Sequence, residues 1–230
     1  IAQYNLGDVS LHYIIPASEF SFQTAEVPAR QARYVQQALP FVIEESVAED
    51  IEDMHLVVGK KLSSQQYPVL LAKIDTMDFW YKAALELGIP LHGMYLDADL
   101  IRSENAATAV LIDGEDALVY AEGLSCTRTS LANLAVYLEL VSNETDDNLS
   151  IHILVAEGER ERHNVLLAQL AQIEQANLEI DTFTCSVFDV VCAAYFNDGD
   201  LTNLCHSRFP GTAQDSQSTL RKWLPLAAVA

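Results

Sequence analysis

The sequence is poor in glycine, and neither its glycines nor its cysteines form a recognised binding motif. Nine glycines in 230 residues leave few positions where the backbone could approach a phosphate group. Neither GxxxxGK[ST] nor GxGxxG occurs. The four cysteines, Cys126, Cys185, Cys192 and Cys205, include no CxxC pair, and Cys205-His206 is the single Cys/His neighbour pair. We therefore expect no phosphate-binding loop, no zinc site, and buried free thiols in a reducing compartment.

Positive charge is also scarce. Thirteen Lys and Arg residues against 33 Asp and Glu residues give a formal net charge of −20. Such a surface repels the phosphates of nucleic acids and of anionic lipids, which excludes nucleic-acid binding and favours a basic protein as partner. Half of the residues are apolar and a fifth are charged, as is typical of a soluble α/β protein. The length allows one large core, or two smaller units of about 100 residues each.

No catalytic motif stands out. Ser125-Cys126 could pair with a histidine, but no GxSxG nucleophile elbow occurs. Carboxylates are so numerous that no pair of them indicates a glycosidase dyad. Asp97 and Asp99 follow a predicted strand and could face a metal ion together, and capping of the strand end is the alternative role. We predict a protein that is not an enzyme, with no catalytic residue, no cofactor and no metal ligand.

Acidic side chains gather in residues 39–56. Apolar residues recur there at three- and four-residue spacing, which predicts one amphipathic helix; they are Leu39, Val42, Ile43, Val47 and Ile51. Like charges four apart on the opposite face should cost about 0.2–0.5 kcal/mol per pair, and no basic partner is evident nearby. That face is either solvated or a docking surface for a basic partner, and residues 139–159 form a competing acidic surface. The candidate partner-binding residues are Glu44, Glu45, Glu49, Asp50, Glu52 and Asp53.

Strands and helices alternate along the rest of the chain. A helix is expected to begin with Asp75 or Thr76 as N-cap and to end at Gly88, and Asp113-Gly114 predicts a tight hairpin turn. Pro40 is expected to break or kink the helix before the acidic stretch. Strands after an antiparallel start, followed by alternating helices, predict a mixed α/β sheet in each half. Strands are predicted at residues 8–15, 19–27, 55–59, 67–72, 89–96, 107–112, 117–121, 123–127, 151–156 and 178–180, and helices at 30–39, 75–87, 131–141, 160–176 and 188–195.

Residues 30–56 resemble a known family. The string comprises Arg-Gln at 30–31, Leu-Pro-Phe at 39–41, Glu-Glu at 44–45, Asp-Ile-Glu-Asp at 50–53 and His-Leu at 55–56. It resembles the cytoplasmic part of the L component of the bacterial type II (general) secretion system. The rest of the chain matches this family in pattern only. The resemblance implies an actin-like α/β fold of two ribonuclease-H-like halves with mixed sheets flanked by helices, which we expect at residues 1–104 and 105–205.

The remaining residues, 206–230, are expected to be a linker and the start of a truncated transmembrane helix. Asn203-Leu204 is similar to the family's N-L-L-Q-G segment, although Cys205-His206-Ser207 replaces its continuation. The apolar tail, residues 223–230, is too short to span a bilayer, which takes about 20 residues. Arg221 and Lys222 would lie on the cytoplasmic side, and an amphipathic tail is the alternative. The sequence shows no signal peptide and no initiator Met, so we expect the first residues of the natural chain to be missing.

The resemblance also implies a function. It implies a non-enzymatic scaffold at the cytoplasmic face of the inner membrane, which recruits the secretion ATPase by binding its N-terminal domain. M-type and F-type inner-membrane components are the other expected partners, and we expect a homodimer. One alternative is an actin-like ATPase that polymerises with nucleotide, although Glu115 and Asp116 put negative charge on the nearest candidate hairpin, residues 111–116. The other alternative is a type IV pilus-type assembly scaffold of similar fold.

Overall fold

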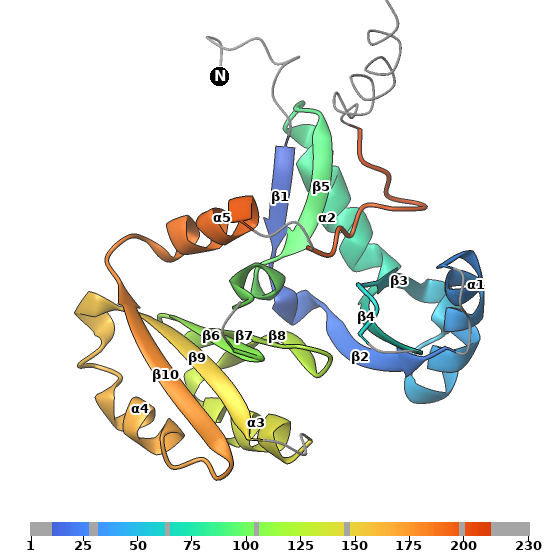
Figure 1. Ribbon diagram of the computed structural model, residues 1–230. Helices are drawn as coiled ribbons and strands as arrows, with labels where there is room; N and C mark the ends of the chain where they lie inside the picture. Colours follow the sequence, from blue (N-terminus) through green and yellow to red (C-terminus); the bar gives the residue numbers. More distant parts are fainter. Residues whose placement is uncertain are drawn as a thin grey trace, which may run out of the picture.

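The computed structural model describes residues 11–27, 32–62, 65–103, 106–144, 148–197 and 201–212. The predicted strand residues 8–10, the start of the predicted helix at residues 30–31 and the tail at residues 221–230 lie outside these ranges. Figure 1 shows two α/β lobes that meet near a 3₁₀ turn, Ala98–Ile101. We call residues 11–103 the first lobe and residues 106–183 the second lobe.

The first lobe contains two small sheets. In one, the strands β1 and β5 pair in parallel, and in the other three strands pair antiparallel in the order β2-β4-β3. The predicted hairpin of residues 55–59 and 67–72 is therefore confirmed. The elements of this lobe are β1 (Leu11–Ile15), β2 (Ser21–Glu26), α1 (Ala32–Ile43), β3 (Met54–Val58), β4 (Gln66–Lys73), α2 (Ile74–Glu86) and β5 (Leu91–Leu96).

The second lobe is built on a five-stranded mixed sheet in the order β10-β9-β6-β7-β8. Strands β6, β7 and β8 form an antiparallel meander. Strand β9 pairs in parallel with β6, and β10 pairs in parallel with β9. This is the mixed sheet predicted for each half, whereas the first lobe divides its strands between two sheets. The elements are β6 (Thr108–Asp113), β7 (Asp116–Ala121), β8 (Ser125–Ser130), α3 (Leu131–Asn143), β9 (Leu149–Ala156), α4 (Asn164–Leu170) and β10 (Ala176–Phe183), followed by α5 (Val187–Asn197).

One hydrophobic cluster is shared by the two lobes, because successive residues of β6 point to opposite faces of the sheet. Val110 and Ile112 pack in a cluster with α3 and α4 on one face. Ala109 and Leu111 point the other way, into a cluster that includes Leu96 of the first lobe. Each fully buried Leu or Val of this kind contributes about 1.5–3 kcal/mol of hydrophobic free energy. A separate cluster joins α1 to the β2-β4-β3 sheet.

The acidic stretch does not form the predicted single helix. Helix α1 ends at Ile43, and two 3₁₀ turns, Glu44–Ser46 and Ile51–Asp53, lead into β3. Val47 is extended, with φ −109° and ψ 146°, so the apolar stripe breaks after Ile43. Repulsion between like charges opposes a helix over these residues. Pro40 lies inside α1, where the buried side chains of Leu39 and Ile43 offset the hydrogen bond that proline removes.

Two other local predictions are corrected and a third is confirmed. The helix expected at residues 160–176 covers only Asn164–Leu170, and Val165, assigned to its apolar face, is 77% exposed. Lys73, with extended dihedral angles, is the N-cap of α2, so Asp75 and Thr76 lie within its first turn. Gly88 follows the end of α2 with φ +66°, a left-handed conformation that glycine adopts without strain, as expected.

The chain returns to the first lobe at its C-terminal end. Residues 201–212, which we call the strap, include the start of the predicted linker but pack along β5 and α2, as Figure 1 shows beside β5. The Leu204 amide donates to the Met94 carbonyl at 2.9 Å, and the Thr212 amide to the Leu91 carbonyl at 2.7 Å. Leu204 and Phe209 are fully buried. These contacts join residues more than 100 positions apart, and no local sequence pattern indicates them.

Removal of the Phe209 ring should therefore destabilise the protein. Phe209 is 1% exposed, and Phe→Ala at such a site costs about 3–5 kcal/mol. We expect Phe209→Ala to lower the free energy of unfolding by this amount in urea titrations. Phe188→Ala is the matched control, because Phe188 is 67% exposed and its loss should change stability by less than about 0.5 kcal/mol. Equal effects of the two substitutions would show that the strap does not belong to the core.

Candidate functional site

All six predicted partner-binding carboxylates are exposed and lie on the turns between α1 and β3. We call Glu44, Glu45, Glu49, Asp50, Glu52 and Asp53 the acidic surface. The Asp50 carboxylate accepts a hydrogen bond from the Glu52 amide at 3.0 Å and so caps the second 3₁₀ turn. Glu49 lies 3.2 Å from the Lys73 ammonium group, so it has the intramolecular partner that the sequence did not suggest. For the other members, the hydrogen-bond and ion-pair contacts of the described chain include no Lys or Arg partner.

Apolar side chains adjoin the acidic surface on α1. Phe41 is 76% exposed and lies directly before the turn that begins at Glu44. Val42 and Tyr34 are also exposed. An exposed aromatic side chain beside charged residues is a common composition for protein-binding surfaces, in which apolar anchors supply the affinity and charges the orientation.

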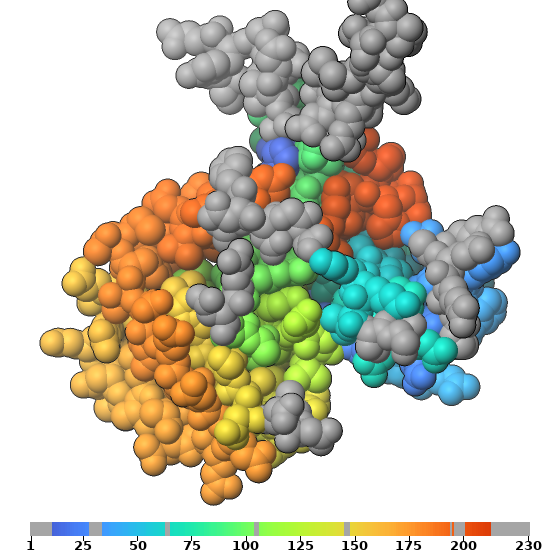
Figure 2. Space-filling model, viewed as in Figure 1, coloured from blue at the N-terminus to red at the C-terminus, as the bar shows by residue number. Residues whose placement is uncertain are grey.

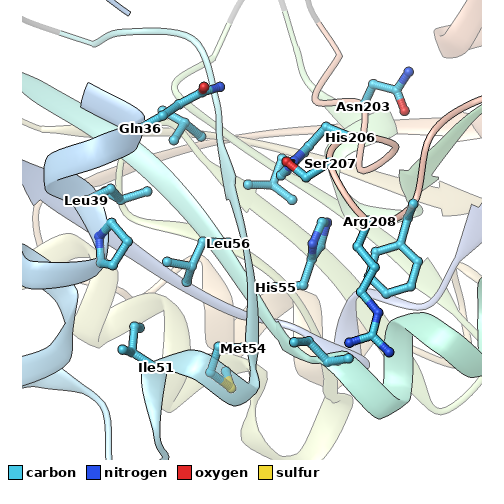
Figure 3. A pocket seen from close by; sticks show the side chains of 15 residues that line it. Gln36, Leu39, Ile51, Met54, His55, Leu56, Asn203, His206, Ser207 and Arg208 are labelled. Atoms are coloured by element: carbon cyan, nitrogen blue, oxygen red, sulfur yellow. The ribbon is translucent and has the colours of Figure 1, made fainter. Parts of the chain in front are cut away.

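Beside this surface lies a groove of about 400 Å³. Figure 3 shows α1 on one side, with Gln36 and Leu39, and the strap on the other, with His206 and Arg208. Strand β3 runs between them, and Met54 and Leu56 point toward the α1 side while His55 points toward the strap. We call this cavity the edge groove. None of its lining residues belonged to the predicted site, because the groove forms only when the strap docks.

Two stacked histidines form the strap side of the edge groove. The rings of His55 and His206 lie 4.5 Å apart between centroids, and Phe209 meets His55 edge-to-face at 5.1 Å. His55 Nε2 donates to the Leu204 carbonyl at 3.0 Å. Burial lowers the pKa of His55 to about 4, although the bond to Leu204 acts in the opposite direction. Burial also lowers the pKa of His206. The two stacked histidine rings are therefore neutral at pH 7, and Arg208 is a cation beside them on this side.

A different cluster of charges lies where the lobes meet. The Arg128 guanidinium, from β8, donates to Asp97 at 3.3 Å, to Asp113 at 2.6 Å and to Asp116 at 3.2 Å. Asp97 Oδ1 also accepts the amides of Ala17 and Ala98, both at 2.8 Å. Burial raises the pKa of Asp97, while these bonds and Arg128 oppose the shift. Asp97 thus has the capping role that was the alternative to metal binding.

The candidate phosphate hairpin is occupied by these ion pairs. Asp113 and Asp116 flank the turn at Gly114, whose φ is +64° as the predicted tight turn requires. A bound phosphate would meet two carboxylates there, Arg128 is already shared among three partners, and Arg162 pairs with Glu115 of the same turn. Within the described ranges, no group of three His, Cys, Asp or Glu side chains could hold a metal ion.

Cys126 and Ser125 are not placed to act as nucleophiles. Cys126 is buried, and burial raises the pKa of its thiol well above the ordinary value. The Ser125 hydroxyl pairs with that of Tyr137. Contrary to expectation, the other thiols are not buried: Cys185 is exposed and Cys192 and Cys205 are half-buried. The four cysteines lie in different parts of the chain, so each has its own degree of burial.

Comparison with known proteins finds one family. The family model for type II secretion system (T2SS), protein L, matches residues 1–181. The type II secretion system protein L of Pseudomonas aeruginosa is 28% identical over 92 residues, which cover 40% of this chain and 24% of that protein. The corresponding protein of Dickeya chrysanthemi is 27% identical over 103 residues, covering 44% and 26%. The chain thus matches about a quarter of the length of these relatives.

Solved structures share the fold. The cytoplasmic domain of EpsL, an inner membrane component of the type II secretion system of Vibrio cholerae, matches with a TM-score of 0.67 and 16% identity, over 88% of this chain and 79% of that chain. A chain of the PilM-PilN type IV pilus biogenesis complex matches with a TM-score of 0.51 and 12% identity, over 78% and 70%. The predicted α/β fold class is confirmed. In the part of the chain described, no helix is long and apolar enough to cross a membrane.

The Arg128 cluster predicts that Mg-ATP does not bind at the lobe junction. We expect isothermal titration calorimetry to show no saturable site at millimolar nucleotide. Thermal denaturation should agree, because a ligand at 100 times its Kd would stabilise the protein by about 2.7 kcal/mol. A Kd in the micromolar range would instead favour the actin-like ATPase alternative.

The His55 environment predicts a dependence of stability on pH. The pKa of His55 is about 4 in the folded protein and 6.5 ordinarily. As pH falls below 6.5 the unfolded chain takes up a proton that the folded protein does not, so the free energy of unfolding decreases until pH approaches 4. Between pH 7.5 and pH 5 the loss should be about 2 kcal/mol in urea titrations. His55→Gln should remove this component while the other titrating groups stay unchanged. An identical pH dependence of variant and parent would contradict the assignment.

Proposed function

The chain belongs to the type II secretion system protein L family, and on that premise we propose that it is a non-enzymatic scaffold of the inner-membrane platform that recruits the secretion ATPase. The observation that supports the proposal most directly is the acidic surface beside exposed Phe41. Among the described residues, five of its six carboxylates lack the kind of ion pair that Glu49 makes with Lys73. A basic surface on the N-terminal domain of the ATPase would complement it.

The absence of a usable nucleotide cradle among the described residues supports a scaffold over an enzyme. At the junction of the lobes, where an actin-like ATPase would hold phosphate, Arg128 holds three aspartates instead. The chain would therefore act through binding alone. Its acidic net charge of −20 would speed encounter with a basic partner at low ionic strength.

The proposed location is the cytoplasmic face of the bacterial inner membrane. The Vibrio cholerae neighbour is described as an inner membrane component, and the apolar residues 223–230 after Arg221 and Lys222 fit the start of a membrane helix. In this proposal residues 1–104 and 105–205 are the two structural halves and residues 206–230 lead to the membrane. M-type and F-type components and a second copy of the chain are its further partners.

A pilus-type assembly scaffold is the second candidate, favoured by the fold shared with the PilM-PilN complex. The two functions differ in the partner that binds. Cross-linking of the chain with the secretion ATPase domain, in parallel with a short membrane-protein tail, separates them.

Charge reversal in the acidic surface tests ATPase recruitment. Glu44→Lys together with Glu45→Lys should slow association with the N-terminal domain of the ATPase several-fold at low salt, because rim charges act mainly on the association rate. These positions are chosen because neither carboxylate has an ion pair with a described residue that the substitution would break, unlike Glu49. Surface plasmon resonance across a salt series gives the rate, and the difference should shrink as salt screens the charges.

Glu139→Lys with Glu144→Lys is the matched control. Both residues are exposed, on or directly after α3 of the second lobe, within the competing acidic surface. If this control slows association and the first pair does not, the ATPase docks on the second lobe. If neither pair changes the rate at any salt concentration, the acidic surface is only solvated.

A further inference from the structure

Strand β3 has one side without a strand partner. Among the described strands it lies at the edge of the β2-β4-β3 sheet and pairs with β4 alone. The next residue, Gly59, donates its amide to the Pro68 carbonyl of β4 at 2.8 Å. Because backbone groups of successive strand residues point to opposite sides, Val57 faces β4, and Leu56 and Val58 direct their amides and carbonyls away from it. A hydrogen bond from the His206 ring to the Leu56 backbone supports this assignment.

The open side of β3 lies in the edge groove. Leu56 and Val58 are half-buried groove residues, with α1 on one face and the strap on the other, as Figure 3 shows. A row of backbone groups without a strand partner, lying between two walls, is the arrangement in which an extended peptide can add a strand to a sheet. Residues Met54–Val58 span about 17 Å, enough to pair with a segment of about five residues.

Charge at the mouth of the groove indicates which segment fits. The 3₁₀ turn before β3 places Asp50, Glu52 and Asp53 at that end, all exposed. The nearby cations are engaged, because Lys73 pairs with Glu49 and Arg208 pairs with Asp78, both at 3.2 Å. Basic side chains on an added strand would therefore meet unneutralised carboxylates.

We propose that the edge groove binds an extended basic segment of a partner protein, which adds to β3 as a strand. Its backbone pairs with Leu56 and Val58. Side chains on alternate positions meet Leu39 and Pro40 on one face and the His55 and His206 rings on the other. Lysine or arginine residues reach the carboxylates at the mouth. His206 turns away from the Leu56 carbonyl to release it. The proposal goes beyond ATPase recruitment, since it defines the bound segment by its basic side chains and its extended shape, and places its contacts on the backbone of β3.

Synthetic peptides test the mode of binding on the whole chain. The probe is acetyl-Lys-Val-Lys-Val-Lys-Val-Lys-amide, added to ¹⁵N-labelled protein and followed by NMR. We expect saturable binding, with the largest amide shifts at Leu56 and Val58. A peptide with Glu in place of Lys, and a Lys peptide N-methylated at alternate residues, should each lose affinity by about tenfold or more. Equal binding of the N-methylated peptide, or shifts confined to other surfaces, would overturn the proposal.

Proline substitutions supply the matched variants. Val58→Pro removes an amide that faces the groove, and proline is tolerated on an edge strand where the N–H is not used by the sheet. It should keep the melting temperature and weaken peptide binding about tenfold. Val57→Pro removes an amide that bonds to β4 and should lower the melting temperature. If Val58→Pro folds and binds the peptide as the parent does, β3 does not pair with the peptide; if it fails to fold, the N-methylated peptide decides alone.

Charge variants at different carboxylates of the acidic surface test the two hypotheses one at a time. Glu52→Lys with Asp53→Lys should weaken peptide binding about tenfold at low salt, and Glu139→Lys with Glu144→Lys should leave it unchanged. Glu44→Lys with Glu45→Lys tests ATPase recruitment independently, so either hypothesis can fail without the other. Equal weakening by the control pair would mean that general acidity, not the groove, attracts the peptide, and would overturn the proposal.

Discussion

The carboxylate of Asp97 connects segments that are distant in the sequence, and the meeting of the two lobes depends on it. One oxygen accepts the amides of Ala17, after β1, and Ala98, after β5, and the other accepts from Arg128 of β8. A buried carboxylate without such partners would be costly, so its burial is tolerated only in this arrangement. The apolar cluster that joins β5 to β6 supplies the larger free energy. The polar contacts select the register in which that cluster forms.

The ion pairs of Arg128 oppose the binding of a phosphate group at the junction. Arg128 is held by Asp97 on one side and by the hairpin carboxylates Asp113 and Asp116 on the other. Moving the guanidinium aside for a nucleotide would leave three carboxylates near one another, which repel a phosphate group. Figure 2 shows the lobes in close contact at this junction, with the α1 end of the first lobe projecting from the body. The carboxylates of the acidic surface lie at that projecting end, away from the buried core.

Local patterns in the sequence predicted much of the fold, and contacts across the chain account for what they missed. Asp113-Gly114 predicted its hairpin because only a few residues suit a left-handed turn, and the apolar spacing of residues 131–141 predicted α3. The prediction of an acidic helix was wrong, because apolar periodicity does not account for repulsion between neighbouring carboxylates, and Val47 is extended. The acidic surface was identified from charge. The edge groove was not, because its second wall forms when Leu204 docks on Met94, 110 positions earlier, and nothing in either segment encodes that pairing locally.

The strap also fixes where the described chain ends relative to the acidic surface and the edge groove. Leu11, at the start of β1, bonds to Pro90, and Thr212, the last residue described, bonds to Leu91. Both ends of the described chain therefore meet at the start of β5, at the top of Figure 1, while α1 and the acidic turns lie at the side of the first lobe. A chain that continues past Thr212 toward a membrane would leave from that end. In the proposed scaffold, the acidic surface and the edge groove would then face sideways. The strap, by burying Phe209 and Leu204, fixes this end of the chain relative to the rest of the first lobe.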